Sequence, residues 1–304
     1  MAALPLGCTT NVPAPGGGGP GPTGPTGGNA NQPNVEATVQ EQLSLERVNR
    51  ARLKPGAEAA MNSIAIDEGV PGQLNTTPKQ PVALNAKLMS VARAHCNDML
   101  NRDYFEHNTP EGTTPFNRIT SGGYVYQTAG ENLAWRGTTG TINMTDATEQ
   151  QHLDLFVDST VPGRGHRLIM LGENFREVGI GIVKGDFTQN GTRYDSAMQT
   201  QNYGATPAIS TFVLGVVYND TNSNGRYDAG EGTANSSVTL GTVTKLTNAG
   251  GGYGFEVLTA GTYNLRFASG TNRDLVLDPG SPNLKVDLVN GSSVVVNLGL
   301  GPLP

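Results

Sequence analysis

The chain has 304 residues, a net charge of −6 at pH 7 and an isoelectric point of about 5.2. This length allows one or two domains with a sizeable apolar core. Because the chain is acidic and has no block of basic residues, neither nucleic acid nor an anionic membrane surface is an expected partner, and no apolar run in the sequence is long enough for a transmembrane segment.

Residues 1–34 have the composition of a disordered leader or tether, because the run GGGGPGPTGPTGG offers no apolar side chains for a core. The start, MAALPLGCTT, is too short for an intact signal peptide, although Leu6-Gly7-Cys8 resembles the end of a lipoprotein signal. Two interpretations stay open: Cys8 carries a lipid anchor, or it has no role in a flexible leader. A disulfide with Cys96 is not expected, because the low-complexity leader does not hold Cys8 in place. Cys96 lies in a predicted helix and suits a small buried position.

Residues 35–207 mix helical and strand-like patterns and are expected to form an α+β domain. One helix is predicted to end at Pro55-Gly56. A second has Asn85 as its N-cap and an apolar face that runs to Met99. The other predicted elements are a helix over 147–158 and strands over 178–183 and 194–203.

Two histidines in this part have distinctive neighbours. His107 ends the run Tyr-Phe-Glu-His, and His166 lies in Gly-Arg-Gly-His-Arg, with Gly130-Glu131-Asn132 between them. No single motif is specific, but the ordered series is: LxxVARAHCNDML, FEH, TPEGTTPFNRITSGGY, GENLA, GRGHRLIML, ENFREVGIGIV and MQTQNYG.

This series resembles the CAP superfamily, also called SCP-like or cysteine-rich secretory and pathogenesis-related domains, and in particular its bacterial extracellular branch. The resemblance covers about residues 38–206. It implies an α-β-α sandwich with a central cleft, and a protein that is extracellular or attached to the cell surface.

The resemblance also implies a cleft lined by two histidines and two acidic residues. His107 and His166 match the histidines and Glu131 matches one acid, whereas Ser159 stands at the place of the second acid. Two imidazoles beside a carboxylate suit Zn²⁺, held weakly because two ligands leave the shell incomplete. Glu131 is then the candidate catalytic base. The alternative is a hydrogen-bonded group that only holds the cleft together.

The other two histidines are expected to have no ligand role. His95 lies on the apolar face of its predicted helix and is expected in the core. His152 is near Glu149 and Gln150 and is expected to be solvated.

Residues 208–304 are expected to form a small β-sandwich. Short runs rich in Val, Thr, Tyr and Leu alternate with Gly, Asn and Asp, which is typical of strands joined by tight turns. The predicted strands cover 212–218, 237–240, 253–258, 262–267, 284–289 and 293–298.

A twelve-residue segment of this part matches a calcium-binding loop, with Gly225 at the position of the sharp turn. The flanks are strand-like, so a helical EF-hand is not expected. The segment resembles the SdrD B-like repeats of bacterial surface adhesins; the other interpretation is an Asn/Asp-rich turn without an ion. The predicted Ca²⁺ ligands are Asp220, Asn222, Asn224, Arg226 (through its backbone carbonyl), Asp228 and Glu231.

Three functions stay open for the whole chain. The first is a non-enzymatic binding module for a hydrophobic or cell-envelope ligand, with the sandwich as a calcium-stabilised spacer or adhesive unit. The second is a metal-dependent hydrolase that uses His107, His166 and Glu131. The third is a structural surface protein with an inert cleft. Because the second acid is missing, the first and third are favoured over the second.

Overall fold

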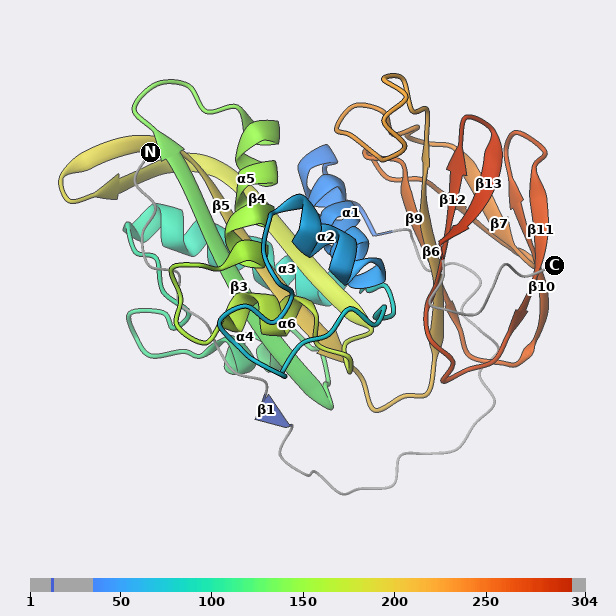
Figure 1. Cartoon of the computed structure of the whole chain (residues 1–304), viewed down its shortest axis with the longest axis horizontal. Helices are drawn as coiled ribbons and strands as arrows, with labels where there is room; N and C mark the ends of the chain where they lie inside the picture. The colour runs from blue at the N-terminus through green and yellow to red at the C-terminus, as the bar shows by residue number, and fades with distance from the viewer. Residues whose placement is uncertain (1–11, 14–34, 297–304) are drawn as a thin grey trace.

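The computed structural model describes residues 12–13 and 35–296. It combines a five-stranded sheet covered by helices with two four-stranded sheets that follow it in the chain (Figure 1). The predictions for the leader and for Cys8 lie outside the described residues, apart from a two-residue strand. In the described part of the chain, no helix has both the length and the apolar character needed to cross a bilayer.

Each of the three longest helices begins at a side-chain N-cap. Thr38 and Glu41 form a capping box at the first, Asn85 caps the second, and Asn143 caps the third. Pro55 was expected to end a helix, but it also begins a new one, since proline is tolerated in the first turn. The described residues contain these helices: α1 (Val39–Leu53), α2 (Pro55–Met61), α3 (Ala86–Arg102), α4 (Pro115–Ser121), α5 (Met144–Val157) and α6 (Gly165–Met170).

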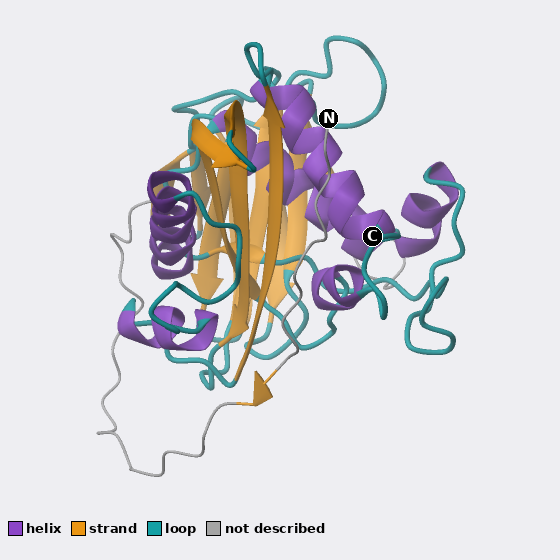
Figure 2. Ribbon diagram, turned by 90° about the vertical axis from the view of Figure 1, so that its left-hand side faces the viewer, coloured by secondary structure: helices purple, strands orange, loops and turns teal. Residues whose placement is uncertain are grey.

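The first sheet has helices on both faces. Helices α3 and α4 pack on one face, and α1, α5 and α6 pack on the other (Figure 2). This layering confirms the expected mixture of helices and sheet. The order of the strands across the sheet is β1 (Val12–Pro13), β3 (Thr128–Thr138), β5 (Thr192–Ala205), β4 (Glu177–Gln189) and β2 (Ala83–Leu84).

The C-terminal part is a β-sandwich. Its two sheets have the strand orders β11-β10-β7-β8 and β13-β12-β6-β9, and they share one apolar core around Val213, Leu265 and Val286. All six predicted strands are present, and the sequence analysis missed only β8 and β11. The strands are β6 (Thr211–Tyr218), β7 (Ser237–Leu240), β8 (Val243–Leu246), β9 (Gly252–Val257), β10 (Gly261–Phe267), β11 (Asn272–Leu277), β12 (Leu284–Val289) and β13 (Ser292–Val296).

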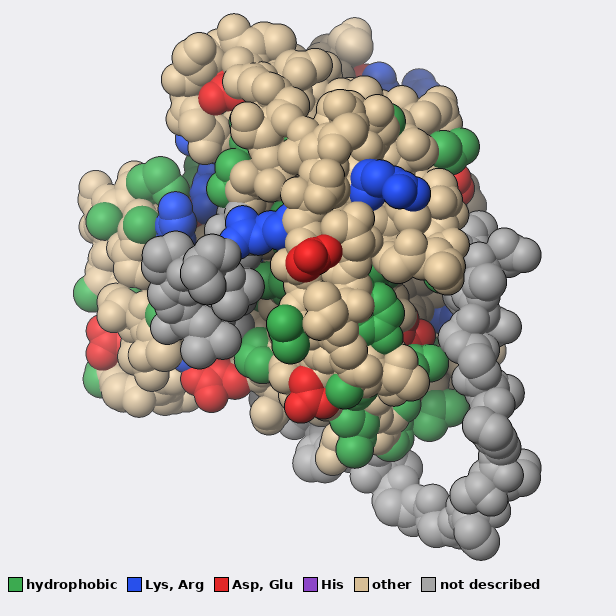
Figure 3. Space-filling view, turned by 90° about the vertical axis from the view of Figure 1, so that its right-hand side faces the viewer, with side chains coloured by type: hydrophobic (Ala, Val, Ile, Leu, Met, Phe, Trp, Pro, Cys, Tyr) green, Lys and Arg blue, Asp and Glu red, His purple; other side chains and the backbone are tan. Residues whose placement is uncertain are grey.

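The outer side of the sandwich carries scattered charges. Figure 3 shows acidic and basic side chains distributed over this side of the molecule rather than gathered in one patch, with apolar side chains in small groups between them. The described residues on this side therefore offer no continuous basic surface for a polyanion.

Candidate functional site

His107 and Glu131, 24 residues apart in the sequence, meet beside strand β3. His107 lies in the loop after α3, and its Nδ1 is 2.9 Å from Glu131 Oε1. Arg118 on α4 donates to both carboxylate oxygens of Glu131, at 3.0 and 2.7 Å, and to the backbone carbonyl of His107, at 2.7 Å. The glutamate is fully buried, and the arginine places a positive charge against it.

This arrangement favours the ionised form of the Glu131 carboxyl. Burial alone would raise the pKa of the Glu131 carboxyl, but the hydrogen bond from His107 and the charge of Arg118 outweigh burial and hold this pKa below its usual value. An ionised Glu131 accepts the Nδ1 proton of His107, which leaves Nε2 as the basic nitrogen of the neutral ring. His107 Nε2 is buried and has no hydrogen-bond partner.

His166, in α6, is held by a different carboxylate. Its Nδ1 is 2.8 Å from Asp158 Oδ1, and both residues are fully or almost fully buried. The sequence analysis placed Ser159 at the position of the second acid, but Ser159 is exposed and the adjacent Asp158 turns inward. Asp158 ends α5 in the left-handed region, with φ of 52°, and this turn separates the directions of the two side chains. An acidic residue next to the expected position was the only signal in the sequence.

His107 with Glu131 and Arg118 forms the first histidine group, and His166 with Asp158 forms the second. The two groups are linked through strand β3. Asn132 follows Glu131 in the chain, and its Nδ2 donates to the backbone carbonyl of His166 at 3.1 Å. Asn202 on β5 lies opposite Glu131 in the sheet and is fully buried, yet neither polar atom of its side chain has a partner. Unpartnered buried amide groups next to the histidines mark a polar interior that a ligand or water can satisfy.

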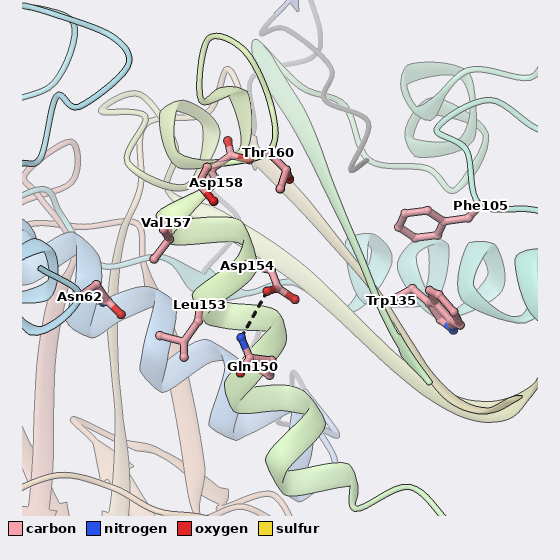
Figure 4. Close-up of a pocket in the computed structure, with 10 residues that line it drawn as sticks. Asn62, Phe105, Trp135, Gln150, Leu153, Asp154, Val157, Asp158 and Thr160 are labelled. Atoms are coloured by element: carbon pink, nitrogen blue, oxygen red, sulfur yellow. Dashed lines mark hydrogen bonds between the residues drawn. The ribbon is translucent and has the colours of Figure 1, made fainter. Parts of the chain in front are cut away.

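A pocket of about 310 Å³ lies beside α5 and its C-terminal turn, and neither His107 nor His166 is among the residues that line it. Figure 4 shows Trp135 and Phe105 facing one side of it and residues of α5 and its C-terminal turn on the other. Asp158 is part of the lining, although its side chain, which holds His166, is itself fully buried. The apolar part of the lining consists of Phe105, Trp135, Leu153 and Val157, and the polar part consists of Asn62, Gln150, Asp154, Asp158, Ser159 and Thr160.

The cleft does not form a complete metal site by itself. Among the described residues, no group of three or more His, Cys, Asp or Glu side chains is arranged to hold a metal ion. Both carboxylates near the histidines are already bound, Glu131 by Arg118 and Asp158 by the backbone N–H of His166. His107 Nε2 has the chemistry of a zinc ligand, but it lacks a protein carboxylate to complete the coordination.

The other histidines and the described cysteine are buried. His95 lies in the core, as expected, with its Nε2 3.1 Å from the Glu106 carbonyl oxygen. The expectation for His152 is wrong: it is 1% exposed, and its Nε2 is 2.8 Å from Glu58 Oε1, because α1 and α2 cover that face of α5. Cys96 is a buried free thiol whose pKa burial raises to about 12.

The side chains of the predicted calcium loop turn toward one another. The amides of Asn222 and Asn224 both donate to Asp228 Oδ2, at 2.9 and 2.5 Å. Asp220 accepts the backbone N–H of Asn224, and Glu231 accepts that of Asp228. Gly225, which follows Asn224, has φ of 75°, and the side chain of Arg226 is half exposed. The side-chain oxygen atoms are therefore gathered, and N–H groups of the loop donate hydrogen bonds to them.

Comparison with known proteins matches residues 45–203, just over half of the chain, to the cysteine-rich secretory protein family, CAP. The uncharacterized protein YkwD of Bacillus subtilis (strain 168) is 32% identical over 105 residues, which are 34% of this chain and 36% of YkwD. The uncharacterized membrane protein YlbC of the same organism is 27% identical over 100 residues, 33% of this chain and 25% of YlbC. The chain therefore spans a quarter to about a third of the length of these curated relatives.

Two solved structures are also similar. One is an extracellular protein containing an SCP domain from Bacillus anthracis (21% identity, 55% of this chain and 40% of that chain, TM-score 0.36). The other is an outer surface protein from Borrelia burgdorferi (12% identity, 57% of this chain and 97% of that chain, TM-score 0.36). From the family match, this chain belongs to the CAP family of cysteine-rich secretory proteins.

Proposed function

We propose that this protein is an extracellular, non-enzymatic binding protein, and that its CAP part takes a small hydrophobic or amphipathic molecule from the cell envelope. The observation that carries the proposal is the pocket of about 310 Å³ lined by Phe105, Trp135 and residues of α5. Its volume is at the lower end of ligand sites, so it suits a small molecule or one end of a longer chain.

The chemistry of the pocket favours an amphipathic ligand. Phe105, Trp135 and Leu153 provide an apolar wall that would remove a hydrocarbon group from water. Asp154 is paired with Arg136, so its charge is already compensated where it borders the pocket. Gln150 donates one N–H to Asp154 Oδ1 at 3.3 Å, and its second N–H and its carbonyl oxygen can bind a polar group of a ligand.

Hydrolysis is the less favoured alternative. A general base near neutral pH needs a pKa close to the working pH, whereas Arg118 and His107 lower the pKa of Glu131. Ser159, the other candidate, is exposed and offers no activated nucleophile. We expect no turnover of peptide or ester substrates; a hydrolysis rate that Glu131→Gln abolishes with the fold intact would establish the enzyme instead.

Two ions belong to the proposal. Zn²⁺ in the cleft would use His107 and His166 and would bind weakly, since water would have to complete its coordination. Calorimetric titration with zinc should then give a small uptake that His107→Ala removes; equal uptake by both proteins would rule out this site. Ca²⁺ would occupy the loop over 220–231, and the resemblance to SdrD B-like repeats and the gathered oxygen atoms support this assignment.

The only tryptophan of the chain lines the pocket, so it can report the ligand directly. We propose a titration of the full chain with monomeric dodecylphosphocholine, followed by the fluorescence of Trp135. A saturable blue shift is expected. Leu153→Gln should weaken it by about tenfold, because a buried apolar contact of this size contributes about 1.5 kcal/mol or more. The matched control Leu258→Gln changes an exposed leucine of the sandwich and should bind like the wild type. No saturable shift, or equal binding by both variants, would contradict the proposal.

A further inference from the structure

Helix α1 is buried on almost every side, although it lies on the surface of the helical layer. Leu45 and Val48 face the core of the CAP part, whereas Leu43 on another side of the helix joins a separate apolar cluster. Figure 1 shows the reason: α1 lies between the five-stranded sheet and the sandwich. The outer side of α1 is therefore covered by the C-terminal part of the chain.

The apolar part of this contact consists of residues from both sides. Leu43 is 0% exposed and packs with Val216 and Tyr218 of β6 and with Tyr227 of the calcium loop. A leucine at this position would face water if the CAP part stood alone. The sandwich buries Leu43 completely, as in the core of a domain. A transient contact between two surfaces would leave such a side chain partly exposed.

A buried cation crosses the same contact. Lys285 on β12 lies with its Nζ 2.8 Å from Glu46 Oε2 of α1 and also pairs with Asp287 of its own strand. The lysine is 3% exposed and Glu46 is 8% exposed. Burial would lower the pKa of Lys285, but the two carboxylates outweigh burial and raise it, so the lysine remains charged. A charge this deeply buried is stable only while its partners stay in place.

A second basic residue joins α1 to the calcium loop. Arg47 donates from Nη1 to the carbonyl oxygen of Tyr227 at 2.7 Å and from Nη2 to Asp228 Oδ1 at 2.9 Å. The same guanidinium holds Glu149 of α5.

Near the other end of the contact, Asn283 donates from Nδ2 to the carbonyl oxygens of Pro81 and Arg176, at 2.9 and 2.8 Å.

We propose that the outer face of α1 is a docking surface for the sheet β13-β12-β6-β9, and that this contact makes the CAP part and the sandwich one cooperative unit of fixed orientation. The sandwich is then an integral support of the CAP part rather than a freely moving spacer. Separation would expose Leu43 and leave Glu46 without its cation, so partial unfolding of one part removes stabilising contacts from the other.

The test uses the full chain and two signals. Trp135 on β3 reports the CAP part alone, and differential scanning calorimetry reports every transition. The wild type should show one endotherm that coincides with the Trp135 transition. Leu275→Ala removes a buried leucine of β11, in the sheet away from α1, and should lower the Trp135 midpoint by about 5 °C or more together with the endotherm. If Leu275→Ala does not fold, Leu275→Val supplies a milder change.

Removal of the crossing cation should uncouple the two parts. Lys285→Met leaves the buried Glu46 without a cation, and the single endotherm should split, with Trp135 following only one of the two transitions. Lys245→Met is the matched control, since Lys245 on β8 donates within the sandwich to the Gly254 carbonyl; its single endotherm should remain. If Leu275→Ala lowers the endotherm of the sandwich while the Trp135 midpoint is unchanged, the two parts are independent and the proposal is wrong.

Discussion

Asp158 holds His166 through two contacts at once. Its Oδ1 lies 2.8 Å from the ring Nδ1 of His166, and its Oδ2 accepts the backbone N–H of the same residue at 2.9 Å. The first contact sets the orientation of the imidazole and the second sets the start of α6. One carboxylate at the C-terminal end of α5 therefore fixes both the ring and the backbone of His166.

We expect Asp158→Asn to lower the free energy of unfolding by about 1–3 kcal/mol, because one of the two N–H groups of His166 would then face an amide donor instead of a carboxylate oxygen. Asparagine tolerates the left-handed backbone at this position, so no backbone strain is added. Urea denaturation measures the change. Ser159→Ala is the control, and its effect should stay below about 0.5 kcal/mol because Ser159 is exposed. Equal effects of the two substitutions would contradict this role of Asp158.

Glu58 should make the fold sensitive to acid. Burial alone would raise its pKa, but hydrogen bonds from His152 and Arg50 outweigh burial and lower it to about 2. A carboxyl whose pKa is lower in the folded state stabilises the fold above its unfolded pKa, and this contribution is lost as the pH falls through the folded value. The contribution at neutral pH is on the order of 3 kcal/mol.

We therefore expect Glu58→Gln to be less stable than the wild type by about that amount at pH 7, with the difference closing between about pH 5 and pH 2. Unfolding curves in urea across this pH range measure it. The control Glu36→Gln removes an exposed carboxylate and should follow the wild type. A stability difference for Glu58→Gln that does not depend on pH would show that the carboxyl charge of Glu58 is not the cause.

Sequence patterns predicted elements well where one physical signal dominates. The apolar period of α3 and its Asn85 cap located that helix. Short apolar runs separated by Gly, Asn and Asp located most strands of the sandwich. The strand β3 was not predicted, because Gly130, Glu131 and Asn132 are poor strand formers. Pairing with β5 holds them in the extended conformation. The short helices α4 and α6 were not predicted, because one or two turns are too short to show a helical period of apolar residues.

The site was predictable only in part, for a similar reason. Motifs located His107 and Glu131. Arg118, which neutralises Glu131, lies on α4 within the run TPEGTTPFNRITSGGY, but nothing in that run indicated a role for it. The inward turn of Asp158 depends on the backbone conformation at the end of α5, which composition does not reveal. The burial of His152 depends on α1 and α2, which are far from it in the sequence.

Calcium should stabilise the full chain modestly. An affinity typical of extracellular modules, about 10⁻⁴ M, gives about 1.4 kcal/mol at 1 mM calcium, if the unfolded chain binds none. If the chain melts as one unit, this raises the melting temperature by about 3–6 °C, and magnesium should do less. Thermal melts in calcium, magnesium and chelator measure the shift. Glu231→Gln should remove most of it; identical melts in calcium and chelator would identify the loop as a turn without an ion.

The approach of helix α3 to strand β4 depends on glycine. A Cβ added at Gly179 would lie 2.0 Å from the carbonyl carbon of Leu88 and 2.2 Å from the nitrogen of Met89, both backbone atoms of α3. Gly181 has the same relation to the next turn of the helix, at Arg93. The two glycines in Val-Gly-Ile-Gly-Ile thus let the helix lie directly against the sheet.

We expect Gly179→Ala to lower the free energy of unfolding by about 3 kcal/mol or more, because backbone atoms cannot rotate away from the new methyl group and the helix itself must shift. The matched control is Gly254→Ala on β9, where an added Cβ meets no atom within 4 Å and the effect should stay below about 1 kcal/mol. His95, on the same helix, contacts the Glu106 carbonyl oxygen next to His107, so a shifted helix should also loosen the loop that carries the first histidine group. Faster amide hydrogen exchange over residues 104–109 in Gly179→Ala, but not in Gly254→Ala, is the expected result. Unchanged exchange alongside lost stability would mean that α3 supports the fold without positioning His107.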